Sequence, residues 1–468
     1  MQAQCHSSSH KLDEIQAQLN TVLGLRRSSS LVSIAGSINT KKVYRNFCKG
    51  IFDSGVTAEM IKSKEKEIHN MFKPPNATTS QSQLPESSNS SDLETLAPLP
   101  TISTEPNQSR LRFPRVLPPV DFLVGPLMLD AAKAGNIKRL KSTLGYVRDI
   151  NFIDDTGATA LHNAASGGYN DVVQLLLSKG ASIGAVDKDN DTPLYCAARY
   201  GHTSTVELLL SKGALMEATN KDNDTPLHCA ARYGHTSTVR LFLSKGALIE
   251  VTNNDNNTPL HLAAQYGHPS TAELFLSKGA LIEATNKVND TPLHLAAHNG
   301  HTSTAELLLS KGASTEVTNN DKNNTPLHSA AQHGHTGTVE LLLSKGALIE
   351  ATNKVNDTPL HLAAHNGHTS TVELLLSKGA LIEVTNKYGD TPLNLAALDG
   401  HTGTVELLLS KGASIEATNK DNYTPLQLAR QCPYSNIEVV KLLERAKVTN
   451  SWRHAEPYLD RGGDNGSL

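Results

Sequence analysis

The chain has 468 residues and a formal net charge of −3, so its composition gives no electrostatic reason to expect binding to nucleic acid or to an anionic membrane. Aromatic residues make up only 4% of the sequence, which is low for a globular enzyme. Five cysteines and a start without a signal-like apolar segment favour a reducing intracellular compartment, the nucleus and/or the cytoplasm. No apolar run approaches the ~20 residues that a membrane-spanning helix needs.

Residues 1–73 are predicted to form a helical N-terminal segment. Four apolar residues near its start recur at helical spacing: Leu12, Ile15, Leu19 and Val22. The following run, Arg26-Arg27-Ser28-Ser29-Ser30, is typical of a basophilic kinase site, but such short motifs are common by chance and we prefer a solvated loop. Residues 74–125 are rich in Ser, Thr, Asn, Gln and Pro and poor in large apolar residues, which predicts a disordered linker.

Residues 126–447 are organised by one repeated pattern. Each copy opens with a tetrad of the type Thr-Pro-Leu-His, and its variants begin at Thr159, Thr192, Thr225, Thr258, Thr291, Thr325, Thr358, Thr391 and Thr424. Successive threonines are 33 residues apart, except for 34 between Thr291 and Thr325. A fixed period of this length indicates one supersecondary unit stacked many times.

The copy that begins at Thr225 shows how one unit is built. Thr225 can accept a hydrogen bond from a free helical N–H, and Pro226 suits the first helical position, so a short helix should begin here. Gly234 supplies a left-handed turn, and Thr236 or Ser237 should start a second helix with an apolar stripe. The remaining residues before the next threonine are expected to form a hairpin-like finger.

The period and the pattern TPLHxAA…G…LLLxxGA resemble ankyrin repeats. The resemblance covers roughly Pro126 to Lys447 and includes a divergent opening copy at residues 127–136, which makes ten repeats. It implies an all-α ankyrin-repeat solenoid of helix-turn-helix pairs with β-hairpin-like fingers. The solenoid would follow the helical and disordered N-terminal region and precede a flexible tail at residues 448–468. The N-terminal region resembles leader segments before ankyrin arrays in filamentous-fungal proteins.

Two departures from the family pattern concern the fingers. The finger usually carries Gly two residues before the threonine, as Gly157 and Gly389 do here; the other copies have Asn190, Asn223, Asn256, Asn289, Asn323, Asn356 and Asn422. Asn tolerates positive φ better than other residues with a side chain, so the turn should survive. A regular column of seven Glu residues, from Glu217 to Glu416, follows the second helices, and lysines end those helices; we interpret both as solvated ladders.

The histidines invite a metal-site hypothesis that the spacing does not favour. Most belong to the tetrads or to a repeated Gly-His turn, so members of one column lie one repeat apart, about 10 Å by helix packing distance. Zinc ligands must converge to about 2 Å from one ion. The resemblance instead implies that tetrad histidines bridge loops by hydrogen bonds. The sequence contains no P-loop, dinucleotide fingerprint, nucleophile elbow or HExxH motif, so we expect no cofactor and no enzymatic activity.

The two positions after the alanines of the tetrad helix line the concave face in the family, and they vary between copies. The candidate partner-binding residues at these positions are Arg199, Tyr200, Arg232, Tyr233, Gln265, Tyr266, His298 and Asn299. Tyrosines in adjacent repeats, two of them beside an arginine, are the residue types that dominate binding hot spots. Drift on a polar surface is the alternative, and the sequence leaves both open.

These features predict a non-enzymatic adaptor that holds one or more proteins on its concave face. By analogy with the family, a regulatory role is favoured, such as a transcriptional co-regulator that bridges a transcription factor without touching nucleic acid or inserting into a membrane. The alternatives are a cytosolic scaffold or membrane-skeleton adaptor, and the recognition part of a fungal innate-sensing protein.

Overall fold

The structure is a computed structural model that describes residues 120–320, 322–431 and 437–455. The described chain forms two compact units, one with residues 120–132 and 136–152 and the other with residues 133–135 and those from 153 onward. The predicted N-terminal segment and most of the predicted linker lie outside the described residues.

The first unit contains α5 (Val120–Lys133) and α6 (Ile137–Leu144). Helix α5 begins before residue 126, where the array was expected to start, and includes Pro126. Proline removes one helical hydrogen bond, but burial of the neighbouring Val124 and Leu127 favours the continuous helix. Asn136 caps α6, because its side chain accepts a 3.0 Å hydrogen bond from the N–H of Arg139.

The second unit is a series of helix pairs. The first helices of the pairs are α7 (Ala160–Ser166), α9 (Pro193–Arg199), α11 (Pro226–Arg232), α13 (Pro259–Gln265), α15 (Pro292–His298), α17 (Pro326–Gln332), α19 (Pro359–His365), α21 (Pro392–Leu398) and α23 (Pro425–Gln431). The second helices are α8 (Asn170–Ser178), α10 (Thr203–Ser211), α12 (Thr236–Ser244), α14 (Pro269–Ser277), α16 (Thr302–Ser310), α18 (Thr336–Ser344), α20 (Thr369–Ser377), α22 (Thr402–Ser410) and α24 (Ile437–Ala455).

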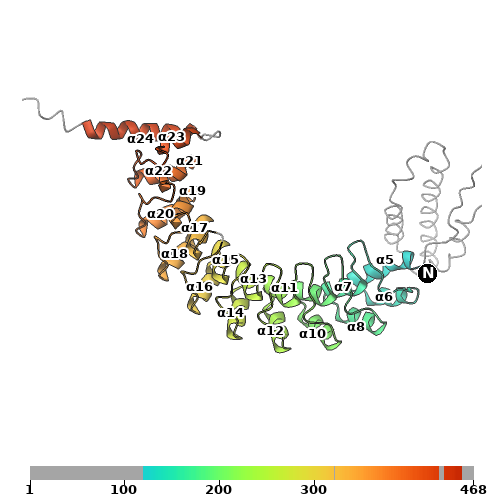
Figure 1. Ribbon diagram of the computed structural model, residues 1–468. Coiled ribbons are helices and arrows are strands. Elements are labelled where there is room, and N and C mark those ends of the chain that lie inside the picture. The colour runs from blue at the N-terminus through green and yellow to red at the C-terminus, as the bar shows by residue number, and fades with distance from the viewer. Residues whose placement is uncertain (1–119, 321, 432–436, 456–468) are drawn as a thin grey trace, which may run out of the picture. The chain divides into compact units, whose positions relative to one another are not determined.

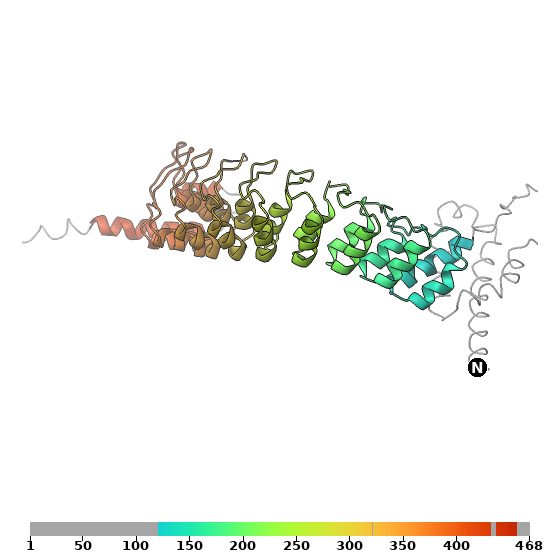
Figure 2. The same ribbon diagram turned by 90° about the horizontal axis from the view of Figure 1, so that it is seen from below.

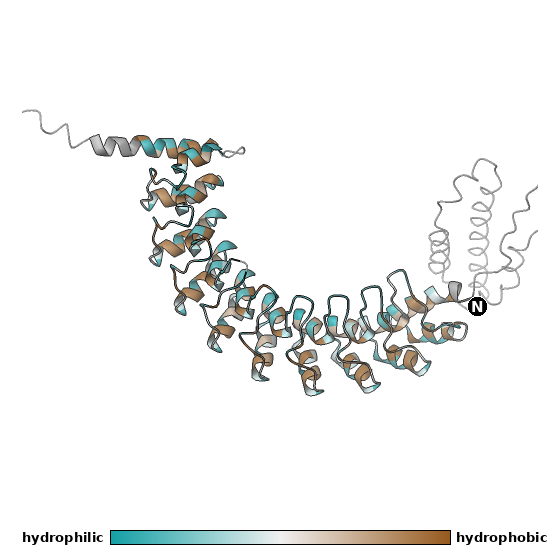
Figure 3. Ribbon diagram, in the orientation of Figure 1, coloured by the Kyte–Doolittle hydropathy of each residue, from teal (hydrophilic) through white to brown (hydrophobic). Residues whose placement is uncertain are grey.

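Within this unit the pairs stand side by side in chain order, with the first helices along one side of the row and the second helices along the other (Figure 1). Figure 2 shows that the loops between pairs project from one edge of the row. Hydrophobic residues lie mainly in the paired helices (Figure 3), and those at the contacts between pairs are small or compact, such as Ala230, Ala231 and Val239. Small side chains let neighbouring helices approach closely and bury a continuous core.

Helix α24 extends further than expected. It continues to Ala455, whereas the flexible tail was predicted to begin at residue 448. No glycine or proline interrupts residues 437–455, so nothing in the local sequence ends the helix earlier. No helix among the described residues is both long and apolar enough to cross a membrane.

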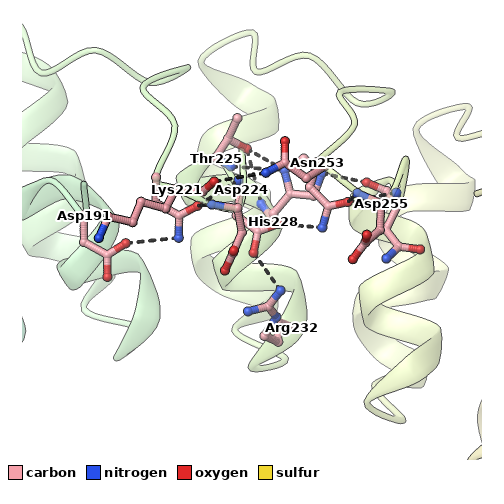
Figure 4. A network of polar contacts seen from close by, with 12 residues as sticks. Asp191, Lys221, Asp224, Thr225, His228, Arg232, Asn253 and Asp255 are labelled. Atoms are coloured by element: carbon pink, nitrogen blue, oxygen red, sulfur yellow. Dashed lines mark hydrogen bonds and ion pairs between the residues drawn. The ribbon is translucent and has the colours of Figure 1, made fainter. Parts of the chain in front are cut away.

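The tetrad builds a helix cap and an inter-repeat link at once. Thr225 precedes α11 and accepts a 3.4 Å hydrogen bond from the N–H of His228, as predicted for an N-cap. The Nδ1 atom of His228 accepts from the Thr225 N–H at 3.2 Å, and its Nε2 donates to the carbonyl of Asn257 in the next finger at 3.0 Å. Figure 4 shows this ring between the cap and the next repeat. The predicted loop-bridging role of the tetrad histidines is therefore confirmed.

The fingers reverse the chain without forming strands among the described residues; the structure has one isolated bridge there, between Ile153 and Thr159. All seven finger asparagines have φ between 56° and 63°, which confirms the prediction that Asn replaces the family glycine in a left-handed turn. The insertion before Thr325 is absorbed in its finger, where the N–H of Asn319 donates to the carbonyl of Asn324 at 3.1 Å. Helices α16 and α17 on either side keep the usual lengths.

A row of threonine hydroxyls also joins consecutive second helices. The first residue of one helix pairs with the third residue of the next, as Thr236 does with Thr271 at 2.8 Å. Proline occupies the first position of α14, so Pro269 cannot pair with Thr304. The hydroxyl of Thr304 is buried without a hydrogen-bond partner among the described residues. The row is therefore broken at one place by one side chain.

We predict that Thr304→Val raises the free energy of unfolding by about 1 kcal/mol, because it removes a buried hydroxyl that has no partner while preserving the shape of the side chain. The matched variant Thr271→Val should lower the free energy of unfolding by about 1 kcal/mol, since it removes the hydrogen bond between the hydroxyls of Thr271 and Thr236. Urea denaturation of the full chain measures both changes. Equal destabilisation by the two substitutions would contradict the assignment.

We also predict that acid destabilises the array through its tetrad histidines. Burial lowers the pKa of His328 to about 4, whereas an unfolded histidine titrates near about 6.5. The contribution of neutral His328 to the free energy of unfolding is therefore complete above the unfolded pKa. It is lost as the pH falls from about 6.5 towards the folded pKa. His328→Asn should reduce the slope of the urea midpoint against pH in this window, since Asn394 fills the same position in its own repeat without titrating. An unchanged slope would show that His328 does not carry the effect.

Candidate protein-binding surface

The predicted binding residues occupy one structural position in successive repeats, the end of the first helix. Arg199 and Arg232 are the last residues of α9 and α11, and a tyrosine follows each of them as the C-cap. Tyr266 is the C-cap of α13. A glycine follows this position and reverses the chain in the same way in each repeat. The side chains at this position in successive repeats therefore lie on the same side of the unit.

Three tyrosines of this column, Tyr200, Tyr233 and Tyr266, form what we call the tyrosine row. Their exposed fractions are 55%, 43% and 46%. A large aromatic side chain with half its surface in water retains much apolar area that a partner can cover.

The arginines link the members of the tyrosine row. The guanidinium of Arg199 lies 5.8 Å from the ring centroid of Tyr233, and that of Arg232 lies 5.9 Å from the ring centroid of Tyr266. Each arginine therefore reaches from its own repeat over the ring of the next. Cation–π contacts of this kind contribute about 0.5–1 kcal/mol at exposed sites, and they restrict the orientation of the rings.

The two arginines differ in their electrostatic partners. Arg232 donates to the Oδ2 atom of the fully buried Asp224 at 2.6 Å, and the Nδ2 of Asn253 donates to Oδ1 of the same carboxylate at 2.8 Å (Figure 4). Arg199 has no carboxylate within ion-pair distance among the described residues. Of the two arginines, only Arg199 therefore lacks an ion-pair partner among the described residues.

The carboxylate that corresponds to Asp224 one repeat earlier is Asp191, which accepts a 3.1 Å hydrogen bond from Asn220. Burial raises the pKa of Asp191 to about 6. At equivalent positions, Asp224 is therefore ion-paired with an arginine, whereas Asp191 has no such pair within the described chain to stabilise its ionised form.

The predicted strip changes in character after Tyr266. The ring of His298 lies against that of His333, with centroids 3.9 Å apart. The side chain of Asn299 donates to the carbonyl of Leu295 at 2.8 Å in its own helix. The tyrosines and arginines therefore gather at Arg199, Tyr200, Arg232, Tyr233 and Tyr266. The other three predicted residues extend the strip: Gln265 is half-buried, whereas His298 and Asn299 are exposed but contact neighbouring groups.

A second set of histidines supports this surface, and sequence reasoning missed its role. The Nε2 atom of His235 donates to the carbonyl of Arg199 at 2.9 Å, and that of His268 donates to the carbonyl of Arg232 at 2.9 Å. Each ring lies so close to the preceding glycine turn that a Cβ at Gly201 would be 2.5 Å from His235. The repeated Gly-His pair was visible in the sequence, but the residue it contacts lies in the previous repeat.

The Glu column differs from the solvated ladder inferred from the sequence. Glu250, for example, accepts a 2.9 Å hydrogen bond from the backbone N–H of Leu281 in the next repeat. Two of the lysines at the helix ends pair with other acids, Lys311 with Glu273 at 3.7 Å and Lys378 with Glu340 at 3.3 Å. The Glu column is exposed, but it also holds successive repeats together.

The described residues offer little reactive chemistry. No three His, Cys, Asp or Glu side chains among them converge on a point that could hold a metal ion. Cys196 and Cys229 are buried, and burial raises the pKa of both thiols to about 12, so they stay protonated and unreactive at neutral pH. What this surface can do is bind.

Stacked helix pairs are the architecture of helical repeat proteins. Here they present an exposed row of aromatic and cationic side chains that is suited to binding another molecule. The family model described as ankyrin repeats matches residues 127–220, 213–286, 281–353 and 360–451. The chain belongs to the ankyrin-repeat family.

Two curated proteins resemble short stretches of the chain. Osteoclast-stimulating factor 1 of Danio rerio is 44% identical over 52 residues, which are 11% of this chain and 24% of that protein. Protein phosphatase 1 regulatory subunit 27 of Mus musculus is 42% identical over 52 residues, 11% of this chain and 34% of that protein. The chain thus spans about a quarter to a third of the length of these relatives. The crystal structure of the human ASB11 ankyrin repeat domain matches at 27% identity and a TM-score of 0.43, covering 47% of this chain and 98% of that one.

We predict opposite effects of removing the charges of Asp191 and Asp224. The raised pKa of Asp191 means that its contribution to stability is present below the unfolded pKa and is lost as the pH rises through about 6. Asp191→Asn should therefore raise the free energy of unfolding at pH 7 by about 1–2 kcal/mol, with little effect at pH 4. Asp224→Asn should lower it at pH 7, because Arg232 loses its counter-charge.

Urea denaturation at both pH values measures these effects, and each variant is the control for the other. Destabilisation by Asp191→Asn at pH 7 would contradict the difference between the two carboxylates.

Proposed function

We propose that the protein is a non-enzymatic protein–protein interaction adaptor and that its main contact surface is the tyrosine row with the adjoining arginines. The observation that carries the proposal is the exposure of Tyr200, Tyr233 and Tyr266, together with the arginine of the preceding repeat that lies over the ring of Tyr233 and of Tyr266. Rigid, half-exposed aromatic side chains lose little conformational entropy on binding and contribute large contact areas. Gln265, His298 and Asn299 extend the proposed contact towards the C-terminal repeats.

We infer that the adaptor has a regulatory role, such as that of a transcriptional co-regulator that holds a transcription factor in the nucleus and/or the cytoplasm. Two observations support this part of the proposal. One curated relative is named as a regulatory subunit of a protein phosphatase. The sequence also has a basic pair followed by Ser28–Ser30, outside the described residues, where phosphorylation would change the local charge.

The domain organisation that goes with this proposal has ten repeats. Helices α5 and α6 form the divergent first one, and the regions before residue 126 and after residue 447 flank the array. An N-terminal region of filamentous-fungal type is part of the same proposal.

We predict that the double variant Tyr200→Ala with Tyr233→Ala weakens the partner complex by at least about 2 kcal/mol, because it removes two adjacent aromatic anchors. The double variant His298→Ala with His365→Ala should cost much less, since the ring of His298 packs on that of His333 and His365 already pairs with Asp399 of the same chain at 2.8 Å. Isothermal titration calorimetry with a partner identified by affinity capture measures both. Equal losses, or a larger loss from the histidine variant, would refute the assignment.

A further inference from the structure

The tyrosine row has a spacing that restricts the conformation of its ligand. Its members occupy the same position in consecutive repeats, so neighbouring rings are about one helix-packing distance apart, roughly 10 Å. A ligand that contacts every ring must present a side chain at about this interval. A β-strand repeats on one face about every 7 Å, which does not fit. A polyproline II helix rises 3.1 Å per residue with three residues per turn, so one face recurs about every 9 Å.

The hydrogen-bonding groups of the row point to the same conformation. Guanidinium groups are donors only, and tyrosine hydroxyls can donate as well as accept, so the row offers donors along its whole length. A proline-rich segment has free carbonyls and few N–H groups, because proline lacks a donor and the polyproline II helix has no internal hydrogen bonds. An α-helix also places residues seven apart at about 10.5 Å, but its carbonyls are bonded internally, so it offers the donors of the row fewer free backbone acceptors.

One charge distinguishes the two ends of the row. Arg232 is neutralised by Asp224, whereas Arg199, beside Tyr200, has no carboxylate partner among the described residues. A ligand carboxylate placed opposite Arg199 would gain a charge-assisted hydrogen bond and would set the direction in which the ligand lies.

We propose that the tyrosine row binds a proline-rich segment of a partner protein in the polyproline II conformation, with an acidic residue opposite Arg199. This inference rests on the proposed function, since it names the class of partner for the same surface. Proline rings pack on aromatic side chains, and the segment is extended before binding, so it loses little entropy on docking.

Fluorescence anisotropy with the full chain tests the proposal. The probe is a fluorescein-labelled peptide of two aspartates followed by about nine prolines, which spans about 28 Å of polyproline II helix and so reaches all three rings. The controls are the same peptide with two serines in place of the aspartates, a glycine–serine peptide of equal length and charge, and an alanine-rich helical peptide with two aspartates. The acidic proline peptide should bind more tightly than all three.

Variants of the protein then locate the site. Tyr200→Ala with Tyr233→Ala should weaken binding of the acidic proline peptide at least about tenfold. Tyr200→Phe with Tyr233→Phe should weaken it less, because only the hydroxyl donors are lost. Arg199→Gln should abolish the preference for aspartate over serine, and His365→Ala, which lies outside the proposed contact, should leave binding unchanged. Circular dichroism confirms that each variant is folded.

The inference would be overturned if the acidic proline peptide bound no better than the glycine–serine or helical peptide, or if the tyrosine variant bound it as tightly as the parent. Its failure is separable from that of the proposed function. If the proline peptide fails but the captured partner still loses affinity with the tyrosine double variant, only the ligand conformation is wrong. If the partner is also insensitive to that variant, the tyrosine row is not the contact surface.

Discussion

The neutral imidazole of the tetrad is the contact on which the stacking depends most. In His228 one nitrogen accepts from the cap of its own helix, and the other donates to the carbonyl of Asn257 in the next finger. A charged ring could not accept at Nδ1, so the link requires the uncharged form, which burial favours. The repeats that lack this histidine show what it contributes. The N–H of Tyr195 donates the cap hydrogen bond to the hydroxyl of Thr192, whereas Asn394 rebuilds the bridge by donating to the carbonyl of Tyr423 over a longer 3.4 Å.

Other inter-repeat contacts also join a polar side chain to a backbone atom of a neighbouring repeat. The Gly-His histidines bind the carbonyl at the end of the preceding first helix, and the Glu column binds a backbone N–H of the following repeat. Because backbone atoms are the partners, these contacts place no demand on the side chain at the end of the first helix. That position is therefore free to vary, and Tyr200, Tyr233 and Tyr266 occupy it in adjacent repeats.

The pair of arginines shows how equivalent positions acquire different properties. Asp191 and Asp224 occupy the same place in consecutive repeats, as do Arg199 and Arg232. The second arginine reaches its carboxylate at 2.6 Å, while the first lies over the ring of Tyr233. A small difference in side-chain direction thus leaves one buried acid with a raised pKa and one cation available on the surface. This difference between Arg199 and Arg232 makes the two ends of the tyrosine row distinguishable to a ligand.

Much of this protein could be predicted from its sequence. The 33-residue period, the capping threonine and the proline that follows it are local signals, and they predicted the helix pairs and their boundaries. The left-handed finger asparagines were predictable for the same reason, since a backbone turn depends on the residue that adopts it. The column that contains Tyr200, Tyr233 and Tyr266 was also identified in advance, because one period places its members at equivalent positions.

The tertiary structure decided which of these residues already have partners. Arg232 is neutralised and Arg199 is not, Asn299 is bound to its own helix, and Thr304 lies opposite a proline. None of this follows from spacing, because each contact joins groups in different repeats or depends on a rotamer. The sequence determined the repeated scaffold, since local backbone preferences recur with the period. Only the packing of one repeat on the next decided which charges and hydroxyl groups remain free, because that depends on which side chains come within hydrogen-bond or ion-pair distance of each other.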